Sequence, residues 1–221
     1  MNKKFPVLNK IREPETEDAS KAVSVIGSVF AVLLGIVFAV LTQVLNHFAN
    51  DSTVWWMDIV GELELNVVFN QWPLWFLFGL AAAVWSWTPL KALINEFLFF
   101  AGVIIGFHIS PKVMEGIEVP ENMKIWYIAL VVAPILAVIF WYSKSKSWPS
   151  IIFDVLIIGI MGAYLFNCGF LYFHFNEDFI VDLLNMVIML LIYILLGSGV
   201  IQLLVTLGGG VLLALALGPV I

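Results

Sequence analysis

The chain has 221 residues and a formal net charge of −6, and 62% of its residues are hydrophobic while only 12% are charged. A water-soluble domain is about half apolar and about a quarter charged, so a soluble fold of this chain would lack the polar residues to cover its surface. The pI of about 4.9 argues against nucleic acid as a partner, because binding nucleic acid requires clustered Lys and Arg. A mean hydropathy of +1.03 predicts that most of the chain lies in a lipid bilayer.

The N-terminal stretch, residues 1–21, is the most polar part of the chain and mixes basic and acidic side chains with two prolines. We expect it to be a disordered cytoplasmic tail. The apolar run that follows, residues 22–45, is too long for the core of a signal peptide and lacks a small-residue cleavage site at its end. It is therefore predicted to be a retained first transmembrane helix, which opens a single transmembrane helical domain over residues 22–221.

Seven apolar segments approach the length of about 20 residues that a helix needs to cross a bilayer. The sequence therefore predicts an all-α, polytopic transmembrane bundle of about seven spans (six to eight), at residues 22–45, 73–87, 90–109, 125–142, 149–168, 179–196 and 200–220. The second segment is short, so it must thin the bilayer or borrow a turn from the residues before it. Only Gly197-Ser198-Gly199 separates the last two, which favours a tight hairpin over one kinked helix, because about 40 apolar residues cannot cross once.

Residues 54–72, between the first two spans, do not have the pattern of an ordinary loop. Val60, Leu63 and Val67 recur at helical spacing, whereas Asp58 falls on another face. We expect one short helix lying in the outer interface, anchored by tryptophans. A re-entrant segment is the alternative.

The distribution of basic residues predicts the orientation of the bundle. With seven crossings, eight of the ten Lys and Arg residues lie on the side of the N-terminus, and only Lys112 and Lys124 lie on the other. Lys and Arg are enriched in cytoplasmic loops, so we expect a cytoplasmic N-terminus and an external C-terminus.

Four polar side chains form the strongest candidate site for a substrate or ion: Lys91, Asn95, Glu96 and Asp154. They lie at similar depth near the cytoplasmic ends of the third and fifth spans. Each ionisable group costs about 2.5–3.5 kcal/mol at mid-bilayer, so such groups usually mark functional sites. We hypothesise that Glu96 and Asp154 face each other and exchange a proton. The alternative is that Lys91 extends to the headgroups and both carboxyl groups reach the water edge.

A weaker candidate cluster lies at the outer side and consists of His108, His174 and Asp182. Such a group could bind a cation, but Asp182 also suits the first turn of a helix, where acidic residues complement the helix dipole. The single cysteine, Cys168, excludes an internal disulfide and any multi-cysteine metal site. We therefore expect neither a metal site nor a cofactor.

Small and polar residues within the spans suggest how the helices pack. Gly102 and Gly106 form a small-residue pair on one helix, and Gly208-Gly209-Gly210 gives another helix a flat face. Asn185 is an amide inside the sixth span, where such groups usually bond to a neighbouring helix.

Residues 74–109 contain a short glycine-bearing helix, the turn Thr88-Pro89-Leu90-Lys91, and Asn95 followed by the phenylalanine-rich residues 97–100. These features, and the segment 141–150, resemble a bacterial family of small multi-spanning membrane proteins that has no assigned function. The resemblance implies a bacterial cell-membrane protein. It implies no activity and assigns no functional residue.

The sequence contains no Walker P-loop, HExxH, GxSxG or GxGxxG motif in the required context, so we do not expect an enzyme. The intramembrane carboxylates favour a transport-related membrane subunit or a small carrier. The alternative is a non-enzymatic accessory, sensor or immunity-type protein that acts by binding another membrane protein. The partners expected are the lipid bilayer and another membrane protein, such as a transporter subunit.

Overall fold

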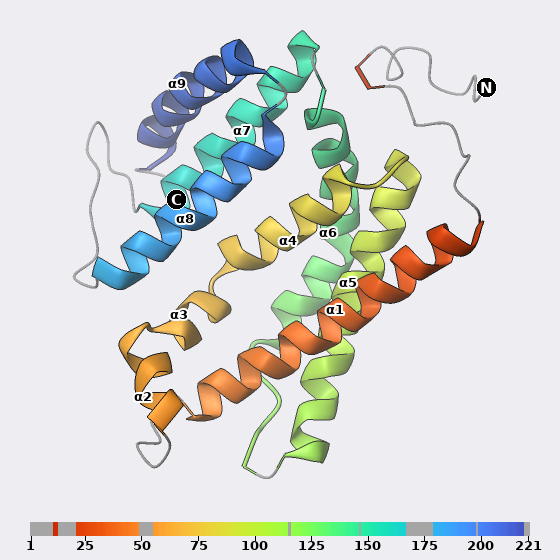
Figure 1. Cartoon of the computed structure of the whole chain (residues 1–221), viewed down its shortest axis with the longest axis vertical. Coiled ribbons are helices and arrows are strands. Elements are labelled where there is room, and N and C mark those ends of the chain that lie inside the picture. Colours follow the sequence, from red (N-terminus) through yellow and green to blue (C-terminus); the bar gives the residue numbers. More distant parts are fainter. Residues whose placement is uncertain are drawn as a thin grey trace.

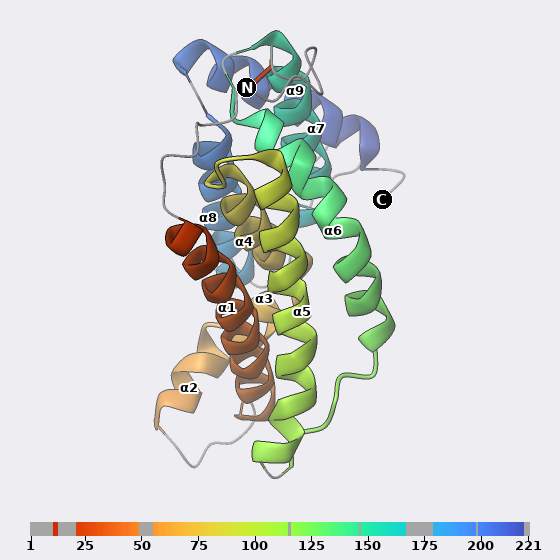
Figure 2. The same ribbon diagram turned by 90° about the vertical axis from the view of Figure 1, so that its right-hand side faces the viewer.

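A computed structural model shows how the chain is arranged (Figures 1 and 2) and describes residues 11–12, 21–48, 55–114, 116–145, 147–166, 179–197 and 199–218. All regular secondary structure in these residues is helical, which confirms the all-α prediction. The helices are α1 (Lys21–Phe48), α2 (Trp55–Glu62), α3 (Leu65–Asn70), α4 (Trp72–Val84), α5 (Pro89–Val113), α6 (Met123–Ser143), α7 (Trp148–Leu165), α8 (Phe179–Leu196) and α9 (Val200–Leu217).

In the described part of the chain, α1, α5, α6, α7 and α9 are long and apolar enough to cross a membrane. The other two apolar segments form the shorter helices α4 and α8. Helix α4 stops at Val84, short of the predicted end at residue 87. The reason is local: Thr88 caps the next helix by accepting a hydrogen bond from the Lys91 amide, and Pro89 occupies its first turn, where proline is tolerated.

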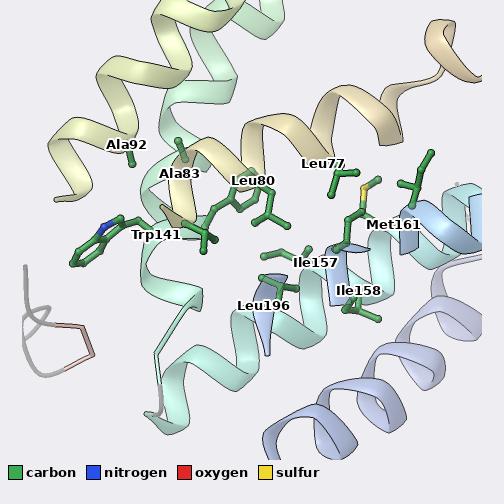
Figure 3. Close-up of a cluster of buried hydrophobic side chains, with 14 of the residues drawn as sticks. Leu77, Leu80, Ala83, Ala92, Trp141, Ile157, Ile158, Met161 and Leu196 are labelled. Carbon is green, nitrogen blue, oxygen red and sulfur yellow. The ribbon is translucent and has the colours of Figure 1, made fainter. Parts of the chain in front are cut away.

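The five long helices pack in a row, in which α5 lies between α1 and α6, and α7 lies between α6 and α9 (Figure 1). The short helices α4 and α8 pack against each other; α4 also contacts α5 and α6, and α8 also contacts α7. Their buried side chains form one core with those of α5, α6 and α7, including Leu80, Ala92, Trp141, Ile157 and Leu196 (Figure 3). The short helices therefore pack along the middle of the row, against α5, α6 and α7.

Helices α1 and α5 run parallel and come close enough for their backbones to touch. A Cβ atom at Gly35 would lie 2.1 Å from the Phe99 carbonyl oxygen, and one at Gly102 would lie 2.2 Å from the Val32 carbonyl oxygen. Gly106 packs in the same way on the next turns of α1. The predicted packing role of Gly102 and Gly106 is thus confirmed.

Helices α7 and α9 form a second parallel pair. Ser150 contacts Gln202 near the start of both helices, whereas Gly162 contacts Ala214 near their ends. Gly210 of the predicted flat face lies on this interface, but Gly208 faces open space, because a Cβ atom there would meet nothing within 4 Å. Parallel neighbours require the chain to return between them, and α8 supplies that return.

The expected hairpin over residues 179–220 is only partly correct. The chain does break after Leu196, and a new helix begins at Val200, so one kinked helix is excluded. The two helices do not form an extensive interface with each other; both pack on α7 instead (Figure 1). The strong α7–α9 interface therefore replaces the α8–α9 pairing that a hairpin would have.

The expected single interfacial helix is in fact two short helices, α2 and α3. The break lies at Glu64, whose φ of 47° is left-handed and ends regular helix geometry. The break also rotates the buried face: Val68 is buried, whereas Leu63 and Val67 are exposed. The spacing of Val60, Leu63 and Val67 therefore did not mark one continuous apolar face.

Candidate functional site

Most of the polar side chains that bond between helices lie at one end of the bundle. At this polar end, α5, α7 and α9 begin and α4, α6 and α8 end, toward the top of Figure 1. The residues concerned are Arg12, Ser24, Ser28, Ser86, Lys91, Asn95, Lys144, Ser145, Ser150, Asp154 and Gln202.

Lys91 and Asn95, two of the four predicted site residues, belong to one hydrogen-bonded cluster. The Lys91 ammonium donates to the Ser24 carbonyl oxygen at 2.9 Å and to the Ser28 hydroxyl at 3.0 Å. That hydroxyl donates to the Asn95 amide oxygen at 3.1 Å, and the Asn95 Nδ2 donates to the Ser86 hydroxyl at 3.2 Å. These bonds tie the start of α5 to α1 and to the α4–α5 turn, so the cluster has a structural role.

Glu96 lies on the same helix but points to a different neighbour. Its side chain is 2% exposed and packs against Gly79 of α4, where a Cβ atom would lie 2.1 Å from Glu96 Oε1. Within the described residues, its Oε2 has no hydrogen-bond partner. Gly79 therefore makes room for a buried carboxyl group between α4 and α5.

Asp154 lies between α7 and α9 and is 1% exposed. Its Oδ2 accepts a hydrogen bond of 2.7 Å from Gln202 Nε2, which also lies 3.3 Å from the Ser150 hydroxyl. Asp154 Oδ1 and the buried Thr206 hydroxyl have no partner in the part of the chain that the structure describes. Gln202 and Thr206 were not among the predicted site residues, although two polar residues one turn apart in an apolar helix are a usable signal.

The hypothesis that Glu96 and Asp154 face each other is wrong. Helix α6 packs between α5 and α7, so the two carboxyl groups lie in separate interfaces. Glu96 faces α4, and Asp154 faces α9. A role for either carboxyl group in binding an ion or a substrate stays a prediction.

Lys144 binds the end of α8. Its Nζ donates to the carbonyl oxygens of Leu195 and Gly197, at 2.6 and 2.8 Å. Burial lowers the pKa of the Lys144 ammonium; the Asp154 carboxylate raises it, and the Arg12 guanidinium lowers it further. Lys144 thus links the end of α8 to the α6–α7 turn, and it is the cation whose field reaches Asp154.

Ile11 and Arg12 form a clasp across the ends of α4 and α6. The Arg12 guanidinium donates to the carbonyl oxygens of Trp141, at 2.9 Å, and Val84, at 3.2 Å. It also lies 4.3 Å from the centroid of the Trp141 ring. The Ile11 carbonyl oxygen accepts a hydrogen bond from the Ser145 hydroxyl. The cation thus satisfies carbonyl groups that helix ends leave without a partner.

We expect Ser145→Ala to loosen the clasp. Losing one hydrogen bond of about 1 kcal/mol should raise the population of the undocked segment about fivefold. Trypsin cleavage after Arg12 in the detergent-solubilised protein, followed by mass spectrometry, measures this population. Ser110→Ala, at the other end of α5, is the control and should leave the cleavage rate unchanged. Equal rates in wild type and Ser145→Ala would contradict the docked clasp.

The structure does not bring the outer cluster together. His108 is exposed on α5, and its Nδ1 lies 2.9 Å from the Ile104 carbonyl oxygen of its own helix. Asp182 is buried on α8, a helix that has no extensive contact with α5. His174 lies outside the described residues. Within the described chain, no three His, Cys, Asp or Glu residues are placed to hold a metal ion.

Comparison of the chain with protein-family models, with curated proteins and with solved structures finds no match. The several apolar helices of the described chain are nevertheless long and apolar enough to cross a bilayer, which is compatible with a helical membrane protein. The activity must be argued from the polar groups that these helices bury.

Proposed function

We propose that the chain is a multi-pass protein of a bacterial cell membrane that takes part in ion-linked transport, either as a small carrier or as a subunit of a larger transporter. One observation carries the proposal. Glu96 and Asp154 lie within candidate spans, are buried, and each has an oxygen with no partner among the described residues. A bacterial membrane is suggested by the resemblance of residues 74–109.

Burying a polar group without a hydrogen bond costs several kcal/mol in a medium that cannot supply a partner. Carboxyl groups in membrane helices are therefore rare, and they usually mark the path of an ion or proton. A purely structural pair would satisfy both oxygens of each group, and neither Glu96 nor Asp154 meets that condition within the described chain. Uptake and release of an ion accounts for such groups.

The directions of the helices support seven crossings. Because α1 runs parallel to α5, and α7 to α9, the short helices α4 and α8 must carry the chain back between them. Arg12, Lys91 and Lys144 lie at the polar end, where α5, α7 and α9 begin. We infer that this end is cytoplasmic, because basic residues are enriched there.

Cysteine labelling tests the orientation. Ser147→Cys lies in the α6–α7 turn at the polar end, and Glu121→Cys is exposed before α6 at the opposite end. On intact cells, a membrane-impermeant maleimide should label Glu121→Cys at once and Ser147→Cys only after permeabilisation. The reverse pattern would overturn the orientation.

Proteoliposomes test ion-linked transport. A potassium diffusion potential is imposed with valinomycin, and a pH-sensitive dye inside the vesicles reports proton entry, with and without external Na⁺. We expect wild type to exceed protein-free vesicles, and Glu96→Gln and Asp154→Asn to fall toward that background. Asp58→Asn, at an exposed position on α2, is the matched control and should keep the wild-type rate.

Fluxes equal to those of protein-free vesicles under every ionic condition would contradict the proposal. The accessory alternative, binding to another membrane protein, would then become the leading interpretation. Flux that survives both carboxyl substitutions would instead remove the observation on which the proposal rests.

A further inference from the structure

Four polar residues form a ladder along the parallel α7–α9 interface. Ser150 and Asp154 lie one turn apart on α7, and Gln202 and Thr206 lie one turn apart on α9. Ser150 bonds Gln202 at a separation of 52 residues. The same separation relates Gly162 to Ala214 further along the interface. A separation of 52 residues places Thr206 opposite Asp154.

Two oxygens of this ladder lack partners at matching positions. Asp154 Oδ1 and Thr206 Oγ1 belong to side chains that are each 1% exposed, and no described group hydrogen-bonds to either. Buried oxygens of this kind require an explanation such as an ion or an ordered water. A proton on Asp154 would neutralise the carboxylate, whereas an ion between the two helices would also be coordinated by the Thr206 hydroxyl oxygen.

We propose that the α7–α9 ladder binds a monovalent hard cation, Na⁺, through Asp154 and Thr206. Carboxylate and hydroxyl oxygens suit hard cations. One carboxylate balances one positive charge, whereas a divalent ion would leave a net charge in a medium of low dielectric constant. The Lys144 ammonium, with the Arg12 guanidinium behind it, is the charge that acts on Asp154 from the polar end, and it disfavours a divalent ion further.

Gln202 has a positioning role in this site, because its amide holds the other carboxylate oxygen at 2.7 Å. Glu96 lies outside this ladder, because it faces Gly79 of α4. The exposed Asp58 of α2 also lies outside the ladder and serves as the control. The inference rests on the proposed function and deepens it by naming the ion.

Thermal unfolding of the purified, detergent-solubilised chain tests the site. Na⁺ replaces choline at constant ionic strength, K⁺ is titrated in parallel, and tryptophan fluorescence reports Tm. At a Na⁺ concentration of about 100-fold over Kd, binding to the folded state should raise Tm by several degrees. K⁺ should give a smaller shift.

The variants locate the ion. Asp154→Asn should abolish the Na⁺-dependent shift, and Thr206→Val should weaken the apparent affinity about tenfold, the equivalent of one lost ligand. Thr206→Ser keeps the hydroxyl and should retain the shift. Asp58→Asn should respond to Na⁺ as wild type does. If Asp154→Asn does not purify as a folded protein, the comparison of Thr206→Val with Thr206→Ser tests the Na⁺ site.

No Na⁺-specific shift in wild type would overturn the site, as would wild-type responses in Asp154→Asn or Thr206→Val. These failures differ from a failure of the transport proposal. Proton flux without a Na⁺ shift would remove the Na⁺ site alone. A Na⁺ shift that depends on Asp154 and Thr206, without flux in vesicles, would support the site and remove transport.

Discussion

Gly35→Ala is expected to prevent stable assembly of the bundle, whereas Gly27→Ala, earlier in the same helix, should be tolerated. The added methyl group at Gly35 would lie 2.1 Å from the Phe99 carbonyl oxygen and 2.9 Å from the Val103 amide nitrogen. Both are backbone atoms of α5, so no side-chain rotation relieves the clash. A Cβ atom at Gly27 would meet nothing within 4 Å.

The size of the stability loss in Gly35→Ala depends on which atoms must move to relieve the clash. Overpacking a core typically costs about 1–3 kcal/mol, when side chains can adjust. Here α1 and α5 must separate, which also loosens the close contacts of Gly102 and Gly106. The expected loss is at the upper end of that range or beyond it, since small residues and close backbones are the main source of helix association in a bilayer.

Thermal stability and monodispersity in detergent measure the outcome, and the α7–α9 pair supplies a graded series. At Gly210 the nearest atom is a side-chain carbon of Ile158, at 2.4 Å, and the nearest backbone atom lies 3.6 Å away, so the contact is less rigid than the one at Gly35. Gly208 faces open space. We expect the loss to fall in the order Gly35→Ala, Gly210→Ala, Gly208→Ala. Equal losses at Gly35 and Gly27 would contradict the close α1–α5 crossing.

Hydropathy predicts the apolar helices well, because each span must bury its own backbone hydrogen bonds. The ends depend on local chemistry that hydropathy does not include. Thr88 and Pro89 start α5 and so cut α4 short of residue 87. A left-handed φ at Glu64, rare in a residue other than glycine, divides the expected interfacial helix.

The depth of each buried carboxyl group along its helix could be predicted from the sequence, but the neighbouring helix that it faces could not. Glu96 follows Asn95 directly, and a step of about 100° per residue turns it from the α1 side to α4. Asp154 lies near the start of its helix as expected, yet its partner, Gln202, comes from a helix 48 residues further along the chain. Their similar depth therefore led to the wrong prediction that Glu96 and Asp154 face each other, although α6 lies between their helices.

Because α6 separates the two carboxyl groups, we expect two double variants to differ strongly in thermal stability. Asp154→Leu removes the shorter of the two hydrogen bonds that Gln202 Nε2 donates and leaves the longer one to Ser150, which we expect to cost about 1–3 kcal/mol. Gln202→Leu leaves the carboxyl group without its donor. The double variant Asp154→Leu/Gln202→Leu removes both partners and should recover much of the combined loss, since an apolar pair fits this lipid-embedded interface.

Glu96→Leu combined with Asp154→Leu should behave differently, because the two side chains share no partner in the described structure. The stability losses of mutations at independent sites add to within about 0.5 kcal/mol. The loss in this double variant should therefore equal the sum of the losses in the two single variants. The midpoint of thermal unfolding, measured in choline so that Na⁺ binding does not contribute, distinguishes the two cases. Recovery in the Glu96/Asp154 double variant, with additivity in the Asp154/Gln202 double variant, would mean that the carboxyl groups face each other after all and that Asp154 does not belong to the α7–α9 ladder.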